Sequence, residues 1–434
     1  MVKVAPFKGI SYNKQIIDKP DDVMSPPYDI ISEKMQNELY DKHQNNFVKL
    51  ILGKQFSDDT DNNNRYTRAK QLFEQWQKES ILIKSNTPAI YPYKIEYLID
   101  GKKKIMSGFF VLLKLDPDYK YVKAHEKTLS KPKADRLNLM RSCKANLEPI
   151  QLLFIDKENL IGKIIDDIIS KPIYNVKGYD GFIHKLWKID DKKVISNIVS
   201  RFDDEILFIA DGHHRYQTAI NYANEQKKIT KNKDDNASYN YRMVILVNIF
   251  DEGLAILPTH RFIKKSDINL SDLLLKLKKY FTVEEKLVDD KIYDFDLIGK
   301  KIIADIKTDN KHKFALYCKD KYYILTLKDE KLMDDLAKDK SKTWRRLDVS
   351  ILHKIILDKI MGINENNLED HVKYTRVDAE AIQFVDEGMY DLSFLMNATK
   401  IDELKAVAEA GEHMPQKSTY FLPKMLSGLV MYKM

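Results

Sequence analysis

One stretch of this 434-residue chain is more informative about the fold than any other: Phe208-Ile209-Ala210-Asp211-Gly212-His213-His214-Arg215-Tyr216-Gln217-Thr218-Ala219. The apolar run that ends at Ala210 predicts a buried strand, and the apolar residues after Gly212 recur at helical spacing. Two histidines and an arginine therefore lie at the start of a helix, where free N–H groups and the helix dipole attract an anion. We predict a phosphate site at this turn. The alternative is that Asp211 only caps the helix and the histidines are solvated.

The composition is that of a globular protein, with 44% hydrophobic and 32% charged residues. The length suggests two or three domains. A formal net charge of +7 suits small anionic substrates better than dedicated nucleic-acid binding. The two cysteines, Cys143 and Cys318, support neither a disulfide framework nor a thiolate zinc site, and they indicate a reducing, cytoplasmic location. No apolar run has the length of a signal peptide or a membrane span, so we expect no membrane partner.

The rest of the chain predicts helices and strands in a mixed order. Expected strands are 23–27, 91–99, 104–115, 147–154, 206–210, 241–250 and 254–258, and expected helices are 32–40, 66–84, 160–169, 344–361 and one from Thr399 to Gly411. Turn residues predict hairpins at Asp100-Gly101, at 251–253 and at 319–321. This order favours an α+β fold with largely antiparallel sheets. From Ser266 onward the sequence becomes rich in Lys, Leu and Asp. This change in composition predicts a domain boundary near residue 265, which gives domains 1–265 and 266–434.

Two clusters in the N-terminal half contain acids that could act as a general base or bind a substrate amine. In Ser25-Pro26-Pro27-Tyr28-Asp29, two prolines fix the backbone and then present one carboxylate, as a general base requires. A proline-rich turn capped by Asp29 explains the same residues equally well. His125-Glu126-Lys127-Thr128, followed by Arg136 and Arg141, offers an acid for a substrate amine and cations for a carboxylate or phosphate. It is not a zinc-protease motif, because Leu129 stands where the second histidine should be. A solvated charged helix face explains these cations nearly as well.

Two clusters in the C-terminal half carry basic residues. Leu257-Pro258-Thr259-His260-Arg261 places two of them at the end of an apolar strand, where sites are commonly built. The segment from Gly411 to Lys424 contains Lys417-Ser418-Thr419, whose ammonium and hydroxyl groups suit phosphate oxygens. The glycine spacing of a Walker loop is missing. We expect this final loop to return to the phosphate site and close over it.

The motifs of this chain resemble those of a known superfamily. Ala210-Asp211-Gly212-His213-His214-Arg215 resembles the signature of the ParB/sulfiredoxin-like superfamily. Further motifs together resemble one branch of it: Pro6-Phe7, Ser25-Pro26-Pro27-Tyr28-Asp29, His125-Glu126-Lys127-Thr128, Leu257-Pro258-Thr259-His260-Arg261 and Met414-Pro415-Gln416-Lys417-Ser418-Thr419-Tyr420-Phe421. That branch is a full-length family long labelled a domain of unknown function, and it includes pyrophosphate-dependent free serine kinases.

The resemblance implies a ParB-like core that transfers a phosphoryl group from pyrophosphate to the hydroxyl of free L-serine, giving O-phosphoserine and phosphate. It implies Mg²⁺ with the donor and a place in serine metabolism and cysteine biosynthesis. Asp29 is the expected base and Glu126 its rival, while Asp211 would coordinate magnesium or bind the serine hydroxyl. The expected phosphate-binding residues are Gly212, His213, His214, Arg215, Lys417, Ser418, Thr419 and Lys424. The expected substrate-binding residues are His125, Arg136, Arg141, His260 and Arg261.

Several alternatives stay open at this stage. Related free serine kinases use ADP or ATP, so a nucleotide donor is the first. A ParB-like nucleic-acid-binding protein is the second, but it predicts a helix-turn-helix after the histidine turn, where we expect the hairpin Tyr241–Pro258. Sulfiredoxin chemistry needs a cysteine in the turn, where His213 and His214 stand instead. A phosphatase, or a kinase for another small hydroxyl compound, fits the same residues, and the sequence does not indicate an oligomeric state.

Overall fold

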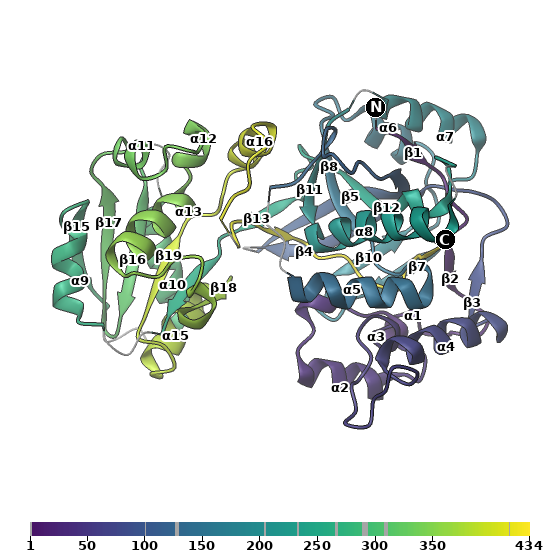
Figure 1. Ribbon diagram of the computed structural model, residues 1–434, viewed down its shortest axis with the longest axis horizontal. Coiled ribbons are helices and arrows are strands. Elements are labelled where there is room, and N and C mark those ends of the chain that lie inside the picture. The colour runs from purple at the N-terminus through teal and green to yellow at the C-terminus, as the bar shows by residue number, and fades with distance from the viewer. Residues whose placement is uncertain are drawn as a thin grey trace. The chain divides into compact units, whose positions relative to one another are not determined.

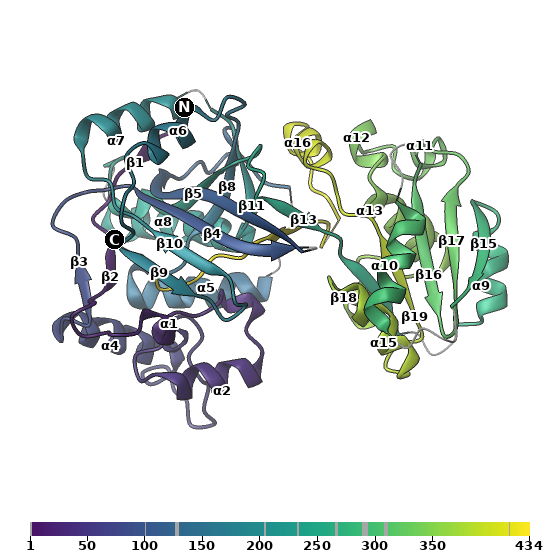
Figure 2. The ribbon, with the colours of Figure 1, turned by 180° about the vertical axis from the view of Figure 1, so that it is seen from behind.

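A computed structural model describes residues 2–99, 101–125, 130–203, 205–231, 234–264, 268–288, 294–307, 311–415 and 417–434. The chain divides into two compact units (Figures 1 and 2). The first unit takes the described residues up to Ala124, those from Ser130 to Ala255, and Pro423–Met434. The second unit takes His125 and Ile256–Leu422. Among the described residues, every helix is too short or too polar to cross a bilayer.

The first unit is built on a mixed sheet whose strands, as described, follow the order β6-β11-β8-β12-β5-β4-β10-β9, with β1 beside β5. Most neighbours are antiparallel, but β11 runs parallel to β6, and β12 runs parallel to β8. The bounds are β1 Val4–Ala5, β4 Tyr91–Ile99, β5 Lys102–Lys114, β6 Val122–Lys123, β8 Ile150–Phe154, β9 Tyr174–Lys177, β10 Ile183–Leu186, β11 Leu207–Asp211 and β12 Tyr241–Asn248.

Helices of the first unit complete its core. Apolar residues of the central strands pack with α6 (Leu160–Asp166), α7 (Lys192–Val199) and the start of α8 (His213–Thr230). Helix α5 (Ser130–Cys143) lies along α8, and Met140 packs against Ala219 and Tyr222 (Figure 1). The N-terminal helices are α1 Pro20–Val23, α2 Glu33–Lys42, α3 Val48–Ile51 and α4 Arg65–Lys78.

The last residues of the chain belong to the first unit. Strand β21 (Tyr432–Lys433) pairs with β7 (Ala145–Asn146), and backbone bridges join Ser427 to Ser25 and Met431 to Ile10. The division of the chain therefore differs from 1–265 and 266–434 in two respects. The change of unit falls between Ala255 and Ile256, and the segment after Leu422 pairs with N-terminal strands rather than with its sequence neighbours.

The second unit holds an antiparallel sheet in the order β15-β17-β16-β19-β14-β18. Its strands are β14 His260–Ile263, β15 Phe281–Leu287, β16 Lys313–Cys318, β17 Lys321–Leu327, β18 Val372–Thr375 and β19 Leu392–Met396, and the short strands β13 (Ala255–Leu257) and β20 (Tyr420–Leu422) pair separately. One apolar cluster joins the sheet to α9 (Leu270–Leu277), α16 (Ile401–Glu409) and the helical run from Asp348 to Ile360. A second joins it to α10 (Phe295–Ile306) and α15 (Asp378–Asp386). The remaining short helices are α11 Leu332–Leu336, α12 Lys342–Arg345 and α14 Leu368–His371.

The main predicted elements are confirmed. The protein is α+β with mostly antiparallel sheets, β11 leads through Gly212 into α8, and β4/β5 and β16/β17 are antiparallel pairs. Ser32 caps α2 by accepting a hydrogen bond from the Met35 N–H, 3.2 Å away. The last helix is followed by Gly411 in a left-handed conformation, as a helix C-terminus favours.

Other predicted elements are wrong. Residues 241–258 are not a hairpin, because β12 is a central strand between β5 and β8 whereas β13 pairs with β20. The segment 23–27 forms one isolated bridge at Ser25, since two prolines cannot donate to a strand ladder. The helix from residue 66 ends at Lys78, and Leu82–Lys84 is strand β3, paired with β2 (Ile10–Tyr12).

Two predicted helix boundaries also need correction. The helix predicted at 344–361 is divided into α12, α13 (Asp348–Ile351) and a more widely wound segment, Leu352–Ile360. Thr399 does not cap α16, because its hydroxyl donates to the Ser418 carbonyl, 2.8 Å away. The helix instead begins after Lys400, whose N–H is bonded by the Glu403 carboxylate.

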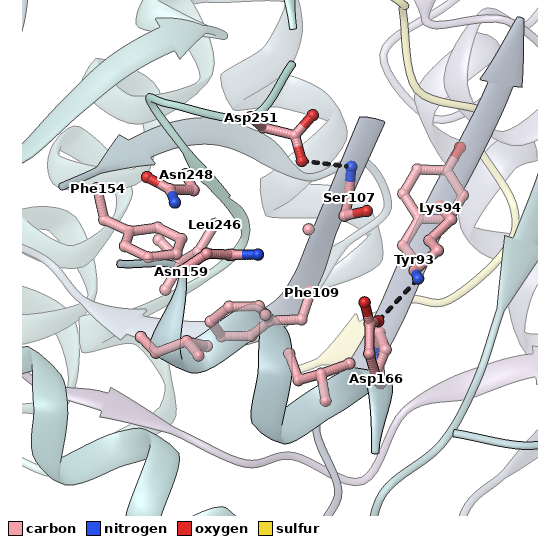
Figure 3. Close-up of a pocket in the computed structure, with 15 residues that line it drawn as sticks. Tyr93, Lys94, Ser107, Phe109, Phe154, Asn159, Asp166, Leu246, Asn248 and Asp251 are labelled. Carbon is pink, nitrogen blue, oxygen red and sulfur yellow. Dashed lines mark hydrogen bonds and ion pairs between the residues drawn. The ribbon is translucent and has the colours of Figure 1, made fainter. Parts of the chain in front are cut away.

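A small cavity of about 60 Å³ lies at one end of the first sheet, where β8 and β12 finish (Figure 3). Phe109, Phe154 and Leu246 form apolar walls, and the Asp251 carboxylate accepts hydrogen bonds from the Ser107 and Gly253 N–H groups at 3.1 and 2.9 Å. Burial raises the pKa of Asp251 to about 6. None of the sequence-predicted site residues lines this cavity.

This buried acid predicts a pH-dependent stability. Its folded pKa exceeds the unfolded value of about 3.9, so its contribution to stability falls as the pH rises from about 4 through 6. Urea unfolding of wild type and Asp251→Asn at pH 4.5 and 7.5 measures this. We expect the stability of the variant relative to wild type to improve at the higher pH. Glu33→Gln, at an exposed acid of α2, should show no such change. An unchanged difference for Asp251→Asn would contradict the prediction.

Candidate functional site

The predicted phosphate turn has the local geometry of an anion site. Gly212 occupies a left-handed conformation (φ 94°) directly before α8, and a Cβ atom there would lie 3.1 Å from Arg215 Nε. Glycine is therefore needed both for the conformation and for the close approach of Arg215. A bulge between Ile209 and Asp211 locally redirects the end of β11. His213 is buried, whereas Gly212 and His214 remain partly exposed and form the accessible side of the turn.

Asp211 is held between two cations rather than used as a cap. Its Oδ2 atom is bonded by Arg215 Nη2, and its Oδ1 atom lies 2.5 Å from Lys424 Nζ. Burial alone would raise the pKa of Asp211, but the charges of Lys424 and Arg215 outweigh it and hold the pKa below its ordinary value. No side chain caps α8. The alternative in which Asp211 only caps the helix is therefore wrong.

The strand register explains why distant charges meet here. Asp211 ends β11 opposite Gln151, which lies near the start of β8. Because β8 and β12 run parallel with Ile150 opposite Val244, the residues just before Ile150 lie beside the start of β12. The carbonyl oxygen of Glu148 accepts a hydrogen bond from Arg242 Nη2 at 2.8 Å. Asp211, Glu148 and Arg242 thus gather at one end of the sheet, opposite to the cavity of Figure 3.

Three buried arginines surround Glu148. Arg136 Nη1 lies 3.4 Å from Glu148 Oε2, and Arg136 also pairs with Asp135 at 2.5 Å. Arg136, Arg215 and Arg242 line a cavity of only about 20 Å³, enough for about one water molecule. Burial and the charge of Arg215 lower the pKa of Arg242 to about 9. The Nε atoms of Arg215 and Arg242 are buried with no hydrogen-bond partner in the described chain. We call Arg136, Arg215 and Arg242 the arginine cluster. Its positive charge lies next to the Gly212 turn, because Arg215 belongs to both.

The turn that carries Asp29 is anchored to the same cluster. The Tyr28 N–H donates to Glu148 Oε1 at 3.1 Å, and the Arg136 guanidinium lies 3.9 Å from the centroid of the Tyr28 ring. Asp29 itself is exposed, in the short 3₁₀ turn Tyr28–Ile30. Its charge is close enough to Arg215 to raise the pKa of that guanidinium, although burial acts in the opposite direction and Asp211 and Glu148 contribute more. The predicted base and the predicted phosphate turn therefore share one electrostatic environment.

Some predicted residues lie elsewhere in the first unit. Arg141 is half-exposed on α5 and pairs with Glu225 of α8 at 2.6 Å, so it belongs to the helix surface and not to the arginine cluster. Arg136, by contrast, belongs to the arginine cluster, and Lys424 forms an ion pair with Asp211. Glu126 lies outside the described residues, together with Lys127 and Thr128.

The other predicted residues belong to the second unit. His260 is fully buried, donates from Nε2 to Asp378 Oδ1 at 2.8 Å and accepts at Nδ1 from the Met396 N–H at 3.3 Å. Both ring nitrogens are therefore used within the fold. His125 Nε2 lies 3.0 Å from Thr419 Oγ1, and the Ser418 hydroxyl donates to the Pro415 carbonyl. Lys417 is exposed in a left-handed conformation. Arg261 is buried, with Nη2 donating to the Lys417 carbonyl at 3.2 Å.

Sequence reasoning missed Glu148 and Arg242, which organise the arginine cluster. Each stands immediately before or at the start of an apolar strand, in Leu147-Glu148-Pro149-Ile150 and Tyr241-Arg242-Met243-Val244. A charge flanking a fully buried strand is a usable signal, since such a side chain needs a partner. Which partner it has depends on strand order, which the sequence does not reveal.

The arrangement does not fit a resident magnesium ion on Asp211. Both of its carboxylate oxygens are bonded to cations, whereas Mg²⁺ requires free oxygen ligands. Within the part of the chain that the structure describes, no three His, Cys, Asp or Glu side chains are grouped as metal ligands. We therefore assign no step to a protein-bound metal.

Comparisons with known proteins give one extensive match. The family described as "Protein of unknown function (DUF1015)" matches residues 4–350. No curated protein matches the chain. Among solved structures, a free serine kinase in complex with AMP is 14% identical with a TM-score of 0.34, covering 74% of this chain and 92% of its own. SbnI with a C-terminal truncation from Staphylococcus aureus is 11% identical with a TM-score of 0.35, covering 73% and 85%. A conserved hypothetical protein from Pyrococcus furiosus is 15% identical with a TM-score of 0.31, covering 75% and 97%. Structural similarities this weak assign no function.

The arginine cluster predicts the effect of Glu148→Gln. This change keeps the shape of the side chain but removes the charge facing buried guanidinium groups, so we expect a loss of about 3 kcal/mol or more in the free energy of unfolding. Inorganic phosphate should raise the melting temperature of the variant more than that of wild type, because the positive field behind the turn is stronger. Thermal unfolding with and without phosphate measures both effects.

Glu225→Gln is the matched control for that experiment, since it removes a carboxylate from the surface pair with Arg141. A surface pair contributes at most about 1 kcal/mol. Equal destabilisation by the two substitutions would contradict the role given to Glu148.

Proposed function

The chain belongs to the family described as protein of unknown function (DUF1015), and from its site geometry we propose that it is a free L-serine kinase that uses pyrophosphate as phosphoryl donor. The products would be O-phosphoserine and inorganic phosphate. One observation carries the proposal. The Asp29 turn and the Asp211-Gly212-His213-His214-Arg215 turn, far apart in sequence, are both anchored at the arginine cluster.

The donor would bind at the N-terminus of α8. Backbone N–H groups at Gly212 and in the first turn of the helix suit a phosphate, and the helix dipole adds to them. Arg215, Arg136 and Arg242 lie behind this turn and strengthen the positive field, while the partly exposed His214 can contact the ligand directly. Phosphoryl transfer depends mostly on charge neutralisation and in-line positioning, so such a field is the principal requirement.

Asp29 would act as the general base. The serine Oγ attacks the terminal phosphorus of pyrophosphate, its proton passes to the Asp29 carboxylate, and the bridging P–O bond breaks to release phosphate. Pro26 and Pro27 hold the backbone before the acid, and the Tyr28 N–H bond to Glu148 fixes it at the cluster. Magnesium would enter as part of the donor, as its magnesium salt. Glu126 stays the rival base. The ParB/sulfiredoxin-like resemblance also implies Lys417, Ser418 and Thr419 as phosphate ligands, but they lie in the second unit and the Ser418 hydroxyl already donates to the Pro415 carbonyl, so we give them no part in holding this donor.

A donor panel tests the proposal. Purified protein, L-serine and MgCl₂ are incubated with pyrophosphate, ADP, ATP or no donor, and O-phosphoserine is measured. We expect product with pyrophosphate alone. Product with a nucleotide only would keep the serine kinase and replace the donor, whereas no product with any donor would overturn the function.

Asp29→Asn tests the base within the same assay. Loss of a general base lowers kcat by roughly 10²–10⁴-fold, with little change in melting temperature because Asp29 is exposed. Asp18→Asn, at an exposed acid in the same N-terminal region, is the control and should keep full activity. Full activity of Asp29→Asn would exclude Asp29 and make Glu126→Gln the next variant.

A further inference from the structure

The second unit contains a buried arginine without a counter-charge. Arg261 is 1% exposed, and its guanidinium bonds only to neutral groups: the Thr259 and Lys417 carbonyls and the Met396 sulfur. Its Nε atom is buried with no hydrogen-bond partner in the described chain. No carboxylate of the described residues forms an ion pair with it. A charge placed this way is costly unless something of opposite sign reaches it.

Arg376 is a second cation without a described counter-charge, although its side chain is only half-buried. No described residue forms a hydrogen bond or ion pair with it, and its Nε atom is likewise buried without a partner. The guanidinium stacks on the Tyr420 ring, 3.9 Å from the centroid. Stacking orients the planar group but leaves its N–H donors unused.

Strand register and contacts place the two arginines together. In the β14–β18 pair, Arg261 lies opposite Tyr374 and His260 opposite Thr375, so Arg376 follows directly at the Thr259 end. Arg261 reaches toward that same end, since Nη1 bonds the Thr259 carbonyl. Both guanidinium groups also contact the segment 417–420, Arg261 at the Lys417 carbonyl and Arg376 at the Tyr420 ring. The exposed Lys417 adds a third positive charge to this segment.

The electrostatics of the neighbouring groups agree with an excess of positive charge. Burial lowers the pKa of Arg261 to about 10. Burial and the charge of Arg261 hold the pKa of His353 well below its ordinary value. In the first unit, Arg136 pairs with Asp135 and Glu148 and Arg215 pairs with Asp211, whereas Arg242 donates to the Glu148 carbonyl.

We propose that Arg261 and Arg376 form a binding site for a phosphate-bearing oxyanion within the second unit. The guanidinium groups supply the unused donors. The nearby hydroxyls do not, because Ser418 donates to Pro415 and Thr419 is bonded to His125. Two guanidinium groups and one ammonium suit a multiply charged phosphate better than a single carboxylate. The site stands on these contacts alone and does not depend on serine phosphorylation.

Hydrogen–deuterium exchange of the full-length protein, with and without inorganic phosphate or pyrophosphate, tests this site. We expect added phosphate to slow exchange in peptides covering 417–422, separately from any effect on 208–216. Arg376→Gln should weaken phosphate binding at 417–422 at least tenfold while leaving the response of 208–216 intact. Arg376→Lys should give an intermediate loss, because it keeps the charge without the planar donors.

Arg346→Gln is the control, since Arg346 already pairs with Glu330 and Asp334. It should leave the phosphate response unchanged. Absence of protection at 417–422 in wild type, or equal protection in Arg376→Gln, would overturn the second site. Either result leaves the donor panel unaffected, so failure of this site and failure of the kinase proposal are distinguishable.

Discussion

The buried carboxylate of Glu148 is the interaction on which the first unit depends. Oε1 accepts from the Tyr28 N–H and from the Ser427 hydroxyl at 3.2 Å, and Oε2 faces Arg136. The backbone carbonyl of the same residue accepts from Arg242. A buried carboxylate without these partners would be strongly unfavourable. The side chain of this one residue therefore joins an N-terminal turn, helix α5 and the C-terminal segment, and its backbone carbonyl adds the start of the central strand β12.

Positive charge is treated differently in the two units. Around Glu148, Arg136 and Arg215 are paired with carboxylates and Arg242 donates to the Glu148 carbonyl, so these guanidinium groups are held within the fold beside the Gly212 turn. Beside the segment 417–420, Arg261 and Arg376 form no ion pair with a carboxylate of the described residues, and their Nε atoms have no hydrogen-bond partner there. The first arrangement holds its donors in place without a ligand, whereas the proposed second site would be completed by an anion. Preorganised donors are what electrostatic catalysis requires, because they need no rearrangement when charge develops.

The C-terminal segment supplies one of the two cations that hold Asp211. Its pairing with β7 and with Ser25 returns Lys424 to Asp211, where Lys424 bonds Oδ1 while Arg215 bonds Oδ2. Both carboxylate oxygens of Asp211 are therefore bonded to cations, and Asp211 positions Arg215 and Lys424 beside the turn. The Asp211 carboxylate therefore offsets part of the surrounding positive charge and orients what remains, instead of offering free oxygens to a metal ion.

The sequence by itself determined the local features of this protein. The abrupt end of an apolar run at Asp211-Gly212 predicted the strand, the turn and the helix, and two prolines before Asp29 predicted a fixed acid, because backbone preferences act over a few residues. Only the tertiary structure decided which charges meet. The Glu148–Arg242 contact follows from the parallel β8–β12 register, and Lys424 reaches Asp211 because the C-terminal segment returns to the first unit. Arg261 is isolated because the fold brings no carboxylate of the described residues into an ion pair with it. Such pairings join residues far apart in the chain. They are fixed by strand order, which cannot be read from short stretches of sequence.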